Sequence, residues 1–240
     1  MRLAYPPSPP GRVLYAIGDI HGRLDLLTKV HRSIDEDRMR TGAASTEIYL
    51  GDYLDRGPEP SAVIQSLIDR AGTHDVVCLR GNHEQLLLDF LQGEVALDTM
   101  LALGAQTTFA SYGVAFDSAE ENDIRERFRA ALPPDHLGFM EAAPFVSFIG
   151  AYVFVHAGLR PGIARKAQTS RDMIWIRDEF LDYDGDFDGI VVHGHTPVEA
   201  PEFKRNRINI DTGAFITNKL TCLKISAAGA AILEGSGAVS

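Results

Sequence analysis

The chain has 240 residues, of which 45% are hydrophobic and 23% charged, with a formal net charge of −10. These values exclude a disordered, collagenous or coiled-coil chain and indicate a globular protein. The negative charge argues against a general binder of nucleic acid or anionic membranes, since such proteins present positively charged faces. The longest nearly apolar run, 145–155, is too short to span a bilayer. Without a secretory signal, and with Cys78 and Cys222 read as reduced thiols, a cytoplasmic location is expected.

The first half of the chain alternates between strand-like and helix-like segments. A Pro-rich extension, 1–12, comes first. Paired strand and helix predictions then follow in chain order: 12–17 with 24–40, 47–50 with 59–71, and 75–79 with 85–92. This alternation predicts βαβ units and a parallel sheet.

The second half begins without a clear strand. Residues 93–143 are predicted to be helical, with segments at 123–132 and 135–142. Strand-like runs follow at 144–149, 151–155, 189–192, 207–211, 219–225 and 229–234. Because no stretch has the composition of a linker, we expect a single α/β domain over 13–240, with a helical insertion around 93–143.

Polar clusters follow five of the predicted strands. They are Gly18-Asp-Ile-His-Gly22, Gly51-Asp-Tyr-Leu-Asp-Arg-Gly57, Gly81-Asn-His-Glu84, His156-Ala-Gly158 and His193-Gly-His195-Thr196. Ligands of open α/β sheets bind outside the carboxyl ends of the strands. The five clusters are therefore expected to converge on one edge.

The side chains in these clusters are oxygen and imidazole donors without thiolates. The donors are Asp19, His21, Asp52, Asn82, His156 and His195. This mixture suits Mn²⁺, Fe or Zn²⁺. Six donors exceed the needs of one tetrahedral ion and suit two divalent ions that share a carboxylate, an arrangement that assists phosphoryl displacement. Arg56 and Arg80 are placed to bind phosphate oxygens.

The motif series GDIHG, GDYLDRG, RGNHE, HAG and GHT resembles the phosphoprotein phosphatase branch of the metallophosphoesterase superfamily. The small bacterial and bacteriophage serine/threonine phosphatases are most similar, and the resemblance covers about residues 12–235. It implies a four-layer α/β/β/α sandwich of two mixed sheets flanked by helices. The specificity lies in the complete series, because HAG or GHT alone would be a weak signal.

The resemblance also implies a role for each matching residue. Asp19 and His21 would bind the first metal, and Asp52 would bridge to the second. Asn82, His156 and His195 would complete the second site. His83 would donate a proton to the leaving group, held in place by Asp55. Arg56, Arg80 and Arg177, the last in Trp175-Ile-Arg177, would bind the substrate phosphate.

The function expected is a metal-dependent phosphomonoesterase, a serine/threonine protein phosphatase with a phosphoprotein or phosphopeptide as substrate. A hydroxide bound to both metals, with manganese favoured over Fe or Zn, would attack phosphorus directly while His83 acts as general acid. The alternative is a symmetrical dinucleoside tetraphosphatase, which typically has Asp where this chain has Glu84. A non-catalytic regulator is disfavoured because every ligand is present. The sequence leaves open the physiological substrate, the preference for tyrosine or for serine/threonine, the oligomeric state, and the roles of Asp211 and the insertion.

Overall fold

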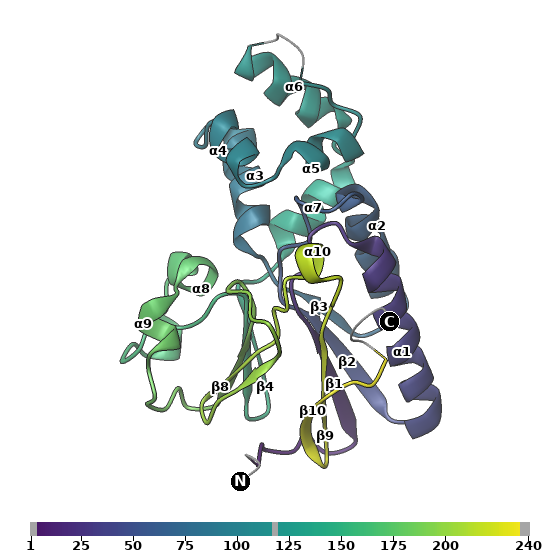
Figure 1. Ribbon diagram of the computed structural model, residues 1–240, viewed down its shortest axis with the longest axis vertical. Coiled ribbons are helices and arrows are strands. Elements are labelled where there is room, and N and C mark those ends of the chain that lie inside the picture. The colour runs from purple at the N-terminus through teal and green to yellow at the C-terminus, as the bar shows by residue number, and fades with distance from the viewer. Residues whose placement is uncertain (1–3, 117–119, 236–240) are drawn as a thin grey trace.

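The computed structural model describes residues 4–116 and 120–235. Parts of the predicted extension 1–12 and insertion 93–143 therefore lie outside the described residues, as does the end of the chain. Two five-stranded sheets face each other, with helices on their outer faces (Figure 1). This is the four-layer α/β sandwich that the resemblance implies.

The first sheet has the strand order β10-β9-β1-β2-β3. Its centre is the parallel set predicted from the alternation, β1 (Arg12–Ile17), β2 (Ala44–Tyr49) and β3 (Val76–Cys78), connected by helices α1 (Leu24–Thr41) and α2 (Pro60–Ala71). The C-terminal hairpin of β9 (Cys222–Ser226) and β10 (Gly229–Ile232) adds antiparallel to β1. The sheet is therefore mixed.

The second sheet has the order β4-β5-β6-β8-β7. Its strands are β4 (Val146–Ile149), β5 (Tyr152–Val155), β6 (Ile190–His193), β7 (Glu202–Phe203) and β8 (Arg207–Asn209). β5, β6 and β8 run parallel, and β4 and β7 close the edges antiparallel. The strand-like runs of the second half therefore divide between two sheets, and the short β7 was not predicted.

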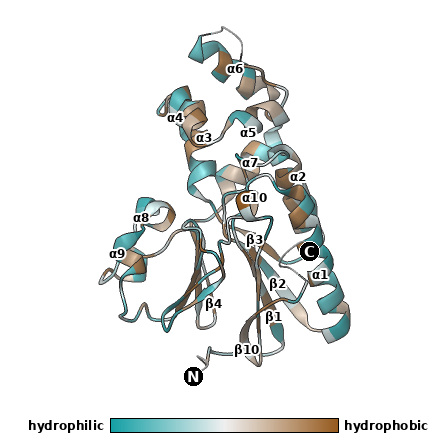
Figure 2. Ribbon diagram, in the orientation of Figure 1, coloured by the Kyte–Doolittle hydropathy of each residue, from teal (hydrophilic) through white to brown (hydrophobic). Residues whose placement is uncertain are grey.

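Three groups of buried apolar side chains hold the layers together. One lies between the first sheet and α1 and α2, and it continues into the insertion. A second fills the space between the two sheets, with Leu14, Phe154 and Ile208 fully buried. The third packs the second sheet against α8 (Ser170–Trp175) and α9 (Asp178–Leu181). In Figure 2 the hydrophobic colour is clear on β3 and α2, whereas the lower end of α1 is hydrophilic.

The described residues of the predicted insertion form helices that extend above the sheets (Figure 1). It follows α3 (Asn82–Gln92) and contains α4 (Leu97–Ala102), α5 (Gln106–Ser111), α6 (Glu121–Ala131) and α7 (Pro134–Ala142). Phe109 of α5 contacts the rings of Phe90 and Phe128, with ring centroids 5.5 and 4.5 Å apart. These contacts hold α5 against α3 and α6.

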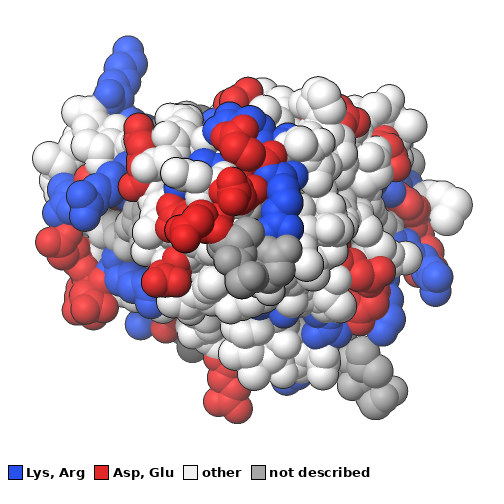
Figure 3. Space-filling view, turned by 90° about the horizontal axis from the view of Figure 1, so that it is seen from above, with Lys and Arg blue, Asp and Glu red and all other residues white. Residues whose placement is uncertain are grey.

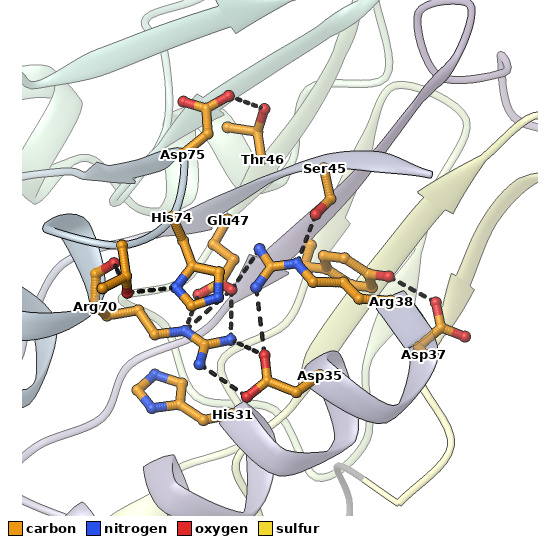
Figure 4. A network of polar contacts seen from close by, with 12 residues as sticks. His31, Asp35, Asp37, Arg38, Ser45, Thr46, Glu47, Arg70, His74 and Asp75 are labelled. Carbon is orange, nitrogen blue, oxygen red and sulfur yellow. Dashed lines mark hydrogen bonds and ion pairs between the residues drawn. The ribbon is translucent and has the colours of Figure 1, made fainter. Parts of the chain in front are cut away.

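A buried carboxylate joins the first sheet to its two helices (Figure 4). Glu47 of β2 is fully buried and accepts hydrogen bonds from Arg70 Nη2, at 2.7 Å, and from the hydroxyl of Tyr49. Arg38 approaches the same carboxylate at 2.7 Å, and Arg70 also pairs with Asp35. Although burial acts in the opposite direction, these partners hold the pKa of Glu47 below its ordinary value.

The surface agrees with the charge balance of the sequence. On the face seen from above, acidic and basic side chains are interspersed (Figure 3).

Over the described parts of the chain, the helices are too short or too polar to cross a membrane. Both cysteines are free, and Cys222 is buried.

Candidate dinuclear metal centre

The five polar clusters meet at the carboxyl ends of strands that belong to both sheets. Asp19 and Asp52 follow β1 and β2 of the first sheet, whereas His156 and His195 follow β5 and β6 of the second. Asn82 begins α3. The sequence predicted that the clusters converge on one edge. The structure brings them together where the strand ends of the two sheets face each other.

Several of the predicted site residues have strained backbone. Among the described residues other than glycine, seven have positive φ, and five of these belong to the predicted site: His21, Asp52, Asp55, Arg56 and His195. Residues with a Cβ rarely adopt this region, and such strain concentrates at functional sites. The surrounding structure therefore imposes these conformations in order to aim the side chains inward.

Two glycines allow the chain to approach the acidic side chains closely. A Cβ on Gly81 would lie 2.2 Å from Asp52 Oδ1, and one on Gly194 would lie 2.1 Å from Asp19 Oδ1. Any side chain at these positions would displace a carboxylate of the site.

Asp52 lies at the centre of two groups of possible metal ligands. His21, Asp52 and His83 form one group and Asp52, His156 and His195 the other, with ligand atoms within 4.8 Å of one another in each. The two carboxylate oxygens of Asp52 face different imidazoles: Oδ2 is 3.5 Å from His21 Nε2, and Oδ1 is 3.4 Å from His156 Nε2. Atoms bound about 2.1 Å from one ion are separated by about 3.0 to 3.4 Å. The geometry thus fits a carboxylate shared by two ions.

The imidazoles are held in the form that binds metal. His21 Nδ1 and His156 Nδ1 lie 2.7 and 2.9 Å from the backbone carbonyls of Leu54 and Leu50, so each ring keeps a proton on Nδ1 and turns the Nε2 lone pair toward Asp52. Burial lowers the pKa of His21 to about 3 and that of His195 to about 2. Neutral imidazoles are the ligating species.

The carboxylates of the site require positive charge. Asp19 is buried, its Oδ2 accepts a hydrogen bond from the backbone N–H of His195, and its Oδ1 has no partner among the described residues. Burial and the carboxylates of Asp211 and Asp52 raise the pKa of Asp19 well above its ordinary value. An orphaned buried carboxylate oxygen beside two other acids fits a divalent cation. Asp211, which the sequence left undecided, is therefore a third carboxylate beside this centre.

Asn82 and His195 complete the second group. Asn82 Oδ1 lies 2.9 Å from His156 Nε2, and His195 Nδ1 lies 3.2 Å from the same nitrogen. The structure therefore brings together all six predicted metal ligands. The sequence assigned them individually to two ions, and that assignment stays a prediction.

His83 differs from the other imidazoles. Its Nδ1 lies 2.5 Å from Asp55 Oδ2, and its Nε2 lies 3.8 Å from Asp52 Oδ2. Burial would lower its pKa, but the negative charges of Asp52 and Asp55 outweigh burial and raise it above the ordinary value. Opposite pKa shifts in neighbouring imidazoles distinguish a group that carries a proton from a neutral group that can bind metal. His83 is thus suited to carry a proton and His21 to bind metal.

The insertion contributes to this pair, which the sequence did not show. Thr108 of α5 is fully buried, its hydroxyl donates to Asp55 Oδ1, and it accepts the backbone N–H of Asp55 at 2.9 Å. The backbone N–H of Arg56 donates to the carbonyl of Gly104, also in the insertion. A lone Thr in a helical segment gives no sequence signal for such a role.

Glu84 is the second residue whose role emerges only from contacts. Its carboxylate accepts hydrogen bonds from the backbone N–H groups of Asp52 and Gly81 through Oε2, and of Tyr53 through Oε1, at 2.8 to 2.9 Å. Burial and the charge of Asp52 raise its pKa to about 7. Glu84 thus fixes the loop that carries Asp52.

The predicted phosphate-binding arginines have different positions. Arg56 Nη2 lies 3.3 Å from His83 Nε2, with its guanidinium over the ring of Phe215. Arg177 Nε donates to His195 Nε2 at 3.2 Å, on the other side of the centre. Arg80 instead donates to Gln85 and to the carbonyl of Glu141. The structure thus brings Arg56 and Arg177, but not Arg80, against the imidazoles of the centre.

The site can now be compared with known proteins. The sequence model of the calcineurin-like phosphoesterase family matches residues 13–220. The chain belongs to this family. The protein is therefore a phosphoesterase, and the metallophosphoesterase superfamily expected from the motifs is confirmed.

Curated relatives cover nearly the whole chain. An asymmetrical bis(5′-nucleosyl)-tetraphosphatase PrpE of Anoxybacillus flavithermus is 30% identical over an alignment of 230 residues that covers 87% of this chain and 88% of the relative. The PrpE protein of Bacillus subtilis is 27% identical over 231 residues, covering 85% and 87%. These proteins are named for asymmetrical cleavage, whereas the alternative expected from the sequence was a symmetrical tetraphosphatase.

Solved structures confirm the fold. A protein provisionally assigned as a diadenosine tetraphosphatase aligns with a TM-score of 0.65 at 17% identity, over 97% of both chains. A protein serine/threonine phosphatase of Saccharomyces cerevisiae aligns with a TM-score of 0.59 at 14% identity, over 97% of this chain and 82% of its own. At these identities the likeness concerns the fold alone.

Proposed function

We propose that this phosphoesterase hydrolyses dinucleoside tetraphosphates asymmetrically, so that water cleaves one anhydride bond to give a nucleoside monophosphate and a nucleoside triphosphate. The observation that carries the proposal is the match over 87% of the chain to relatives named for this activity. Arginines on both sides of the centre also suit a substrate with several phosphates.

In this proposal the centre holds two divalent cations, with manganese as the proposed metal. When bound, such ions would polarise the phosphoryl oxygens and lower the pKa of the attacking water. The chain's own residues do the rest. Arg56 and Arg177 bind phosphate oxygens on either side, and His83, held by Asp55, protonates the leaving oxygen.

A phosphoprotein phosphatase, as the motifs imply, is the second candidate. The pairing of His83 with Asp55, which Thr108 in turn holds, favours it, because an alkoxide leaving group requires a proton far more than a departing phosphate does. The substrate would then be a phosphoserine or phosphothreonine protein.

One preparation of the protein, loaded with Mn²⁺, Fe²⁺ or Zn²⁺ in separate samples, decides between the candidates. We expect kcat/KM for diadenosine tetraphosphate to exceed that for phosphoserine, phosphothreonine and phosphotyrosine peptides, with AMP and ATP in equal amounts. ADP as sole product would show symmetrical cleavage. Faster hydrolysis of a peptide would overturn the proposal in favour of the phosphatase.

A further inference from the structure

A groove lies beside the metal centre and has no role in the chemistry described above. It has a volume of about 910 Å³ and is lined by residues of α3 and α8, and Figure 1 shows α8 below and to the left of α3. Trp175 lines it and is 38% exposed. The ring of Trp175 also lies 5.9 Å from that of His195, edge to face. The groove therefore opens next to a predicted metal ligand.

The lining combines flat aromatic surface with positive charge. Trp175 and Phe145 contribute aromatic rings, and Leu86 and Ile174 contribute apolar surface. Arg80 lies over the ring of Phe145, with 4.9 Å from its guanidinium carbon to the ring centroid. A groove of this size is in the range of small-molecule sites, which place a few polar groups in an apolar lining.

The polar groups of the groove have the arrangement that a nucleotide needs. Arg171 is exposed at the rim, and among the described residues it makes no hydrogen bond or ion pair, so its guanidinium is available to a phosphate. Asp89, whose Oδ1 accepts from Gln85, offers acceptors for hydroxyl or amino groups. An acidic or apolar peptide would satisfy only one side of this lining.

We propose that the groove between α3 and α8 binds one nucleoside of the substrate, with its base against Trp175 and its adjoining phosphate near Arg171. This inference rests on the proposed function and names the subsite that selects a nucleotide. The phosphate chain would continue from the groove past His195 to the centre. Base stacking on an aromatic side chain tolerates different bases, so the subsite favours nucleosides as a class.

Trp175 is the sole tryptophan of the chain, so fluorescence reports directly on the groove. We expect AMP to quench this fluorescence, adenosine to quench it at higher concentration, and inorganic phosphate to leave it unchanged. Arg171→Glu should weaken AMP binding by about tenfold, the effect of one charge-assisted hydrogen bond. Lys166→Glu, with the same charge change at an exposed position outside the groove, should behave as the wild type.

Kinetics separate this proposal from the proposed function. In Arg171→Glu and in Ser170→Phe, which narrows the groove, KM for diadenosine tetraphosphate should rise while turnover of p-nitrophenyl phosphate stays unchanged. If the wild type does not cleave the tetraphosphate but AMP still quenches Trp175 in an Arg171-dependent way, the function fails and the subsite stands. Cleavage with unchanged KM in both variants and no quenching by AMP or adenosine would overturn the subsite. Quenching by a phosphoserine peptide but not by AMP would overturn it as well.

Discussion

Replacing Thr108 by Val tests whether the insertion controls the general acid. Valine keeps the volume but removes the hydroxyl that donates to Asp55 Oδ1 and accepts from its backbone N–H. The carboxylate oxygen Oδ1 and the backbone N–H of Asp55 then remain buried without the hydroxyl of Thr108. Loss of a charge-assisted hydrogen bond and an unpaired N–H should lower the free energy of unfolding by about 2–4 kcal/mol.

The catalytic effect must depend on the leaving group. Asp55 holds His83, so a displaced Asp55 misorients the proton donor, and general-acid assistance is worth about 10²–10⁴-fold. We expect a loss of about tenfold or more in kcat/KM for phenyl phosphate, whose phenolate is a strong base. The loss for p-nitrophenyl phosphate, whose leaving anion is stable without a proton, should be small.

The assay compares the two esters under identical metal loading, with unfolding followed by urea titration. Thr107→Val is the matched control, because among the described residues Thr107 Oγ1 donates only to the carbonyl of Gly104 and makes no hydrogen bond to Asp55. Equal losses on both esters in a folded Thr108→Val protein would refute the reasoning. So would a Thr108→Val protein that matches the control.

Three further predictions concern the metal ligands and the buried network. Asp52→Asn should reduce bound metal well below two ions per chain, because one carboxylate faces both ligand groups; elemental analysis showing wild-type content would remove Asp52 from the bridge. Arg70→Ala should cost about 3–5 kcal/mol in urea unfolding, since it leaves the buried Glu47 without its main partner, whereas Arg32→Ala, at an exposed position, should cost little. The pKa of Glu47 is lower in the folded state than its unfolded-state value of about 4.3. The ionised carboxylate therefore adds fully to the free energy of unfolding above about pH 4.3, and this stabilisation is lost as the pH falls through the pKa of the folded state. The stability difference between wild type and Glu47→Gln should therefore shrink on acidification below about pH 4, and a constant difference down to pH 3 would contradict this assignment.

The sequence alone determined the family and the chemical class of the site. Local patterns sufficed for this. Alternating apolar runs define β1, β2 and β3, and each polar motif directly follows its strand. Metal ligation also depends on donor type, so Asp, His and Asn at strand ends could be read without knowing how the strands assemble.

Only the tertiary structure decided how the motifs meet. The pairing partner of a strand depends on side chains far away in sequence, so the pattern could not show that β5 and β6 belong to a second sheet. For the same reason the sequence predicted both Arg80 and Arg177 as phosphate ligands, whereas contacts place Arg80 beside Gln85 and Arg177 beside His195. The support that Thr108 gives Asp55 spans 53 residues of chain, and long-range contacts of this kind exist only once packing has brought the helices over the strand ends.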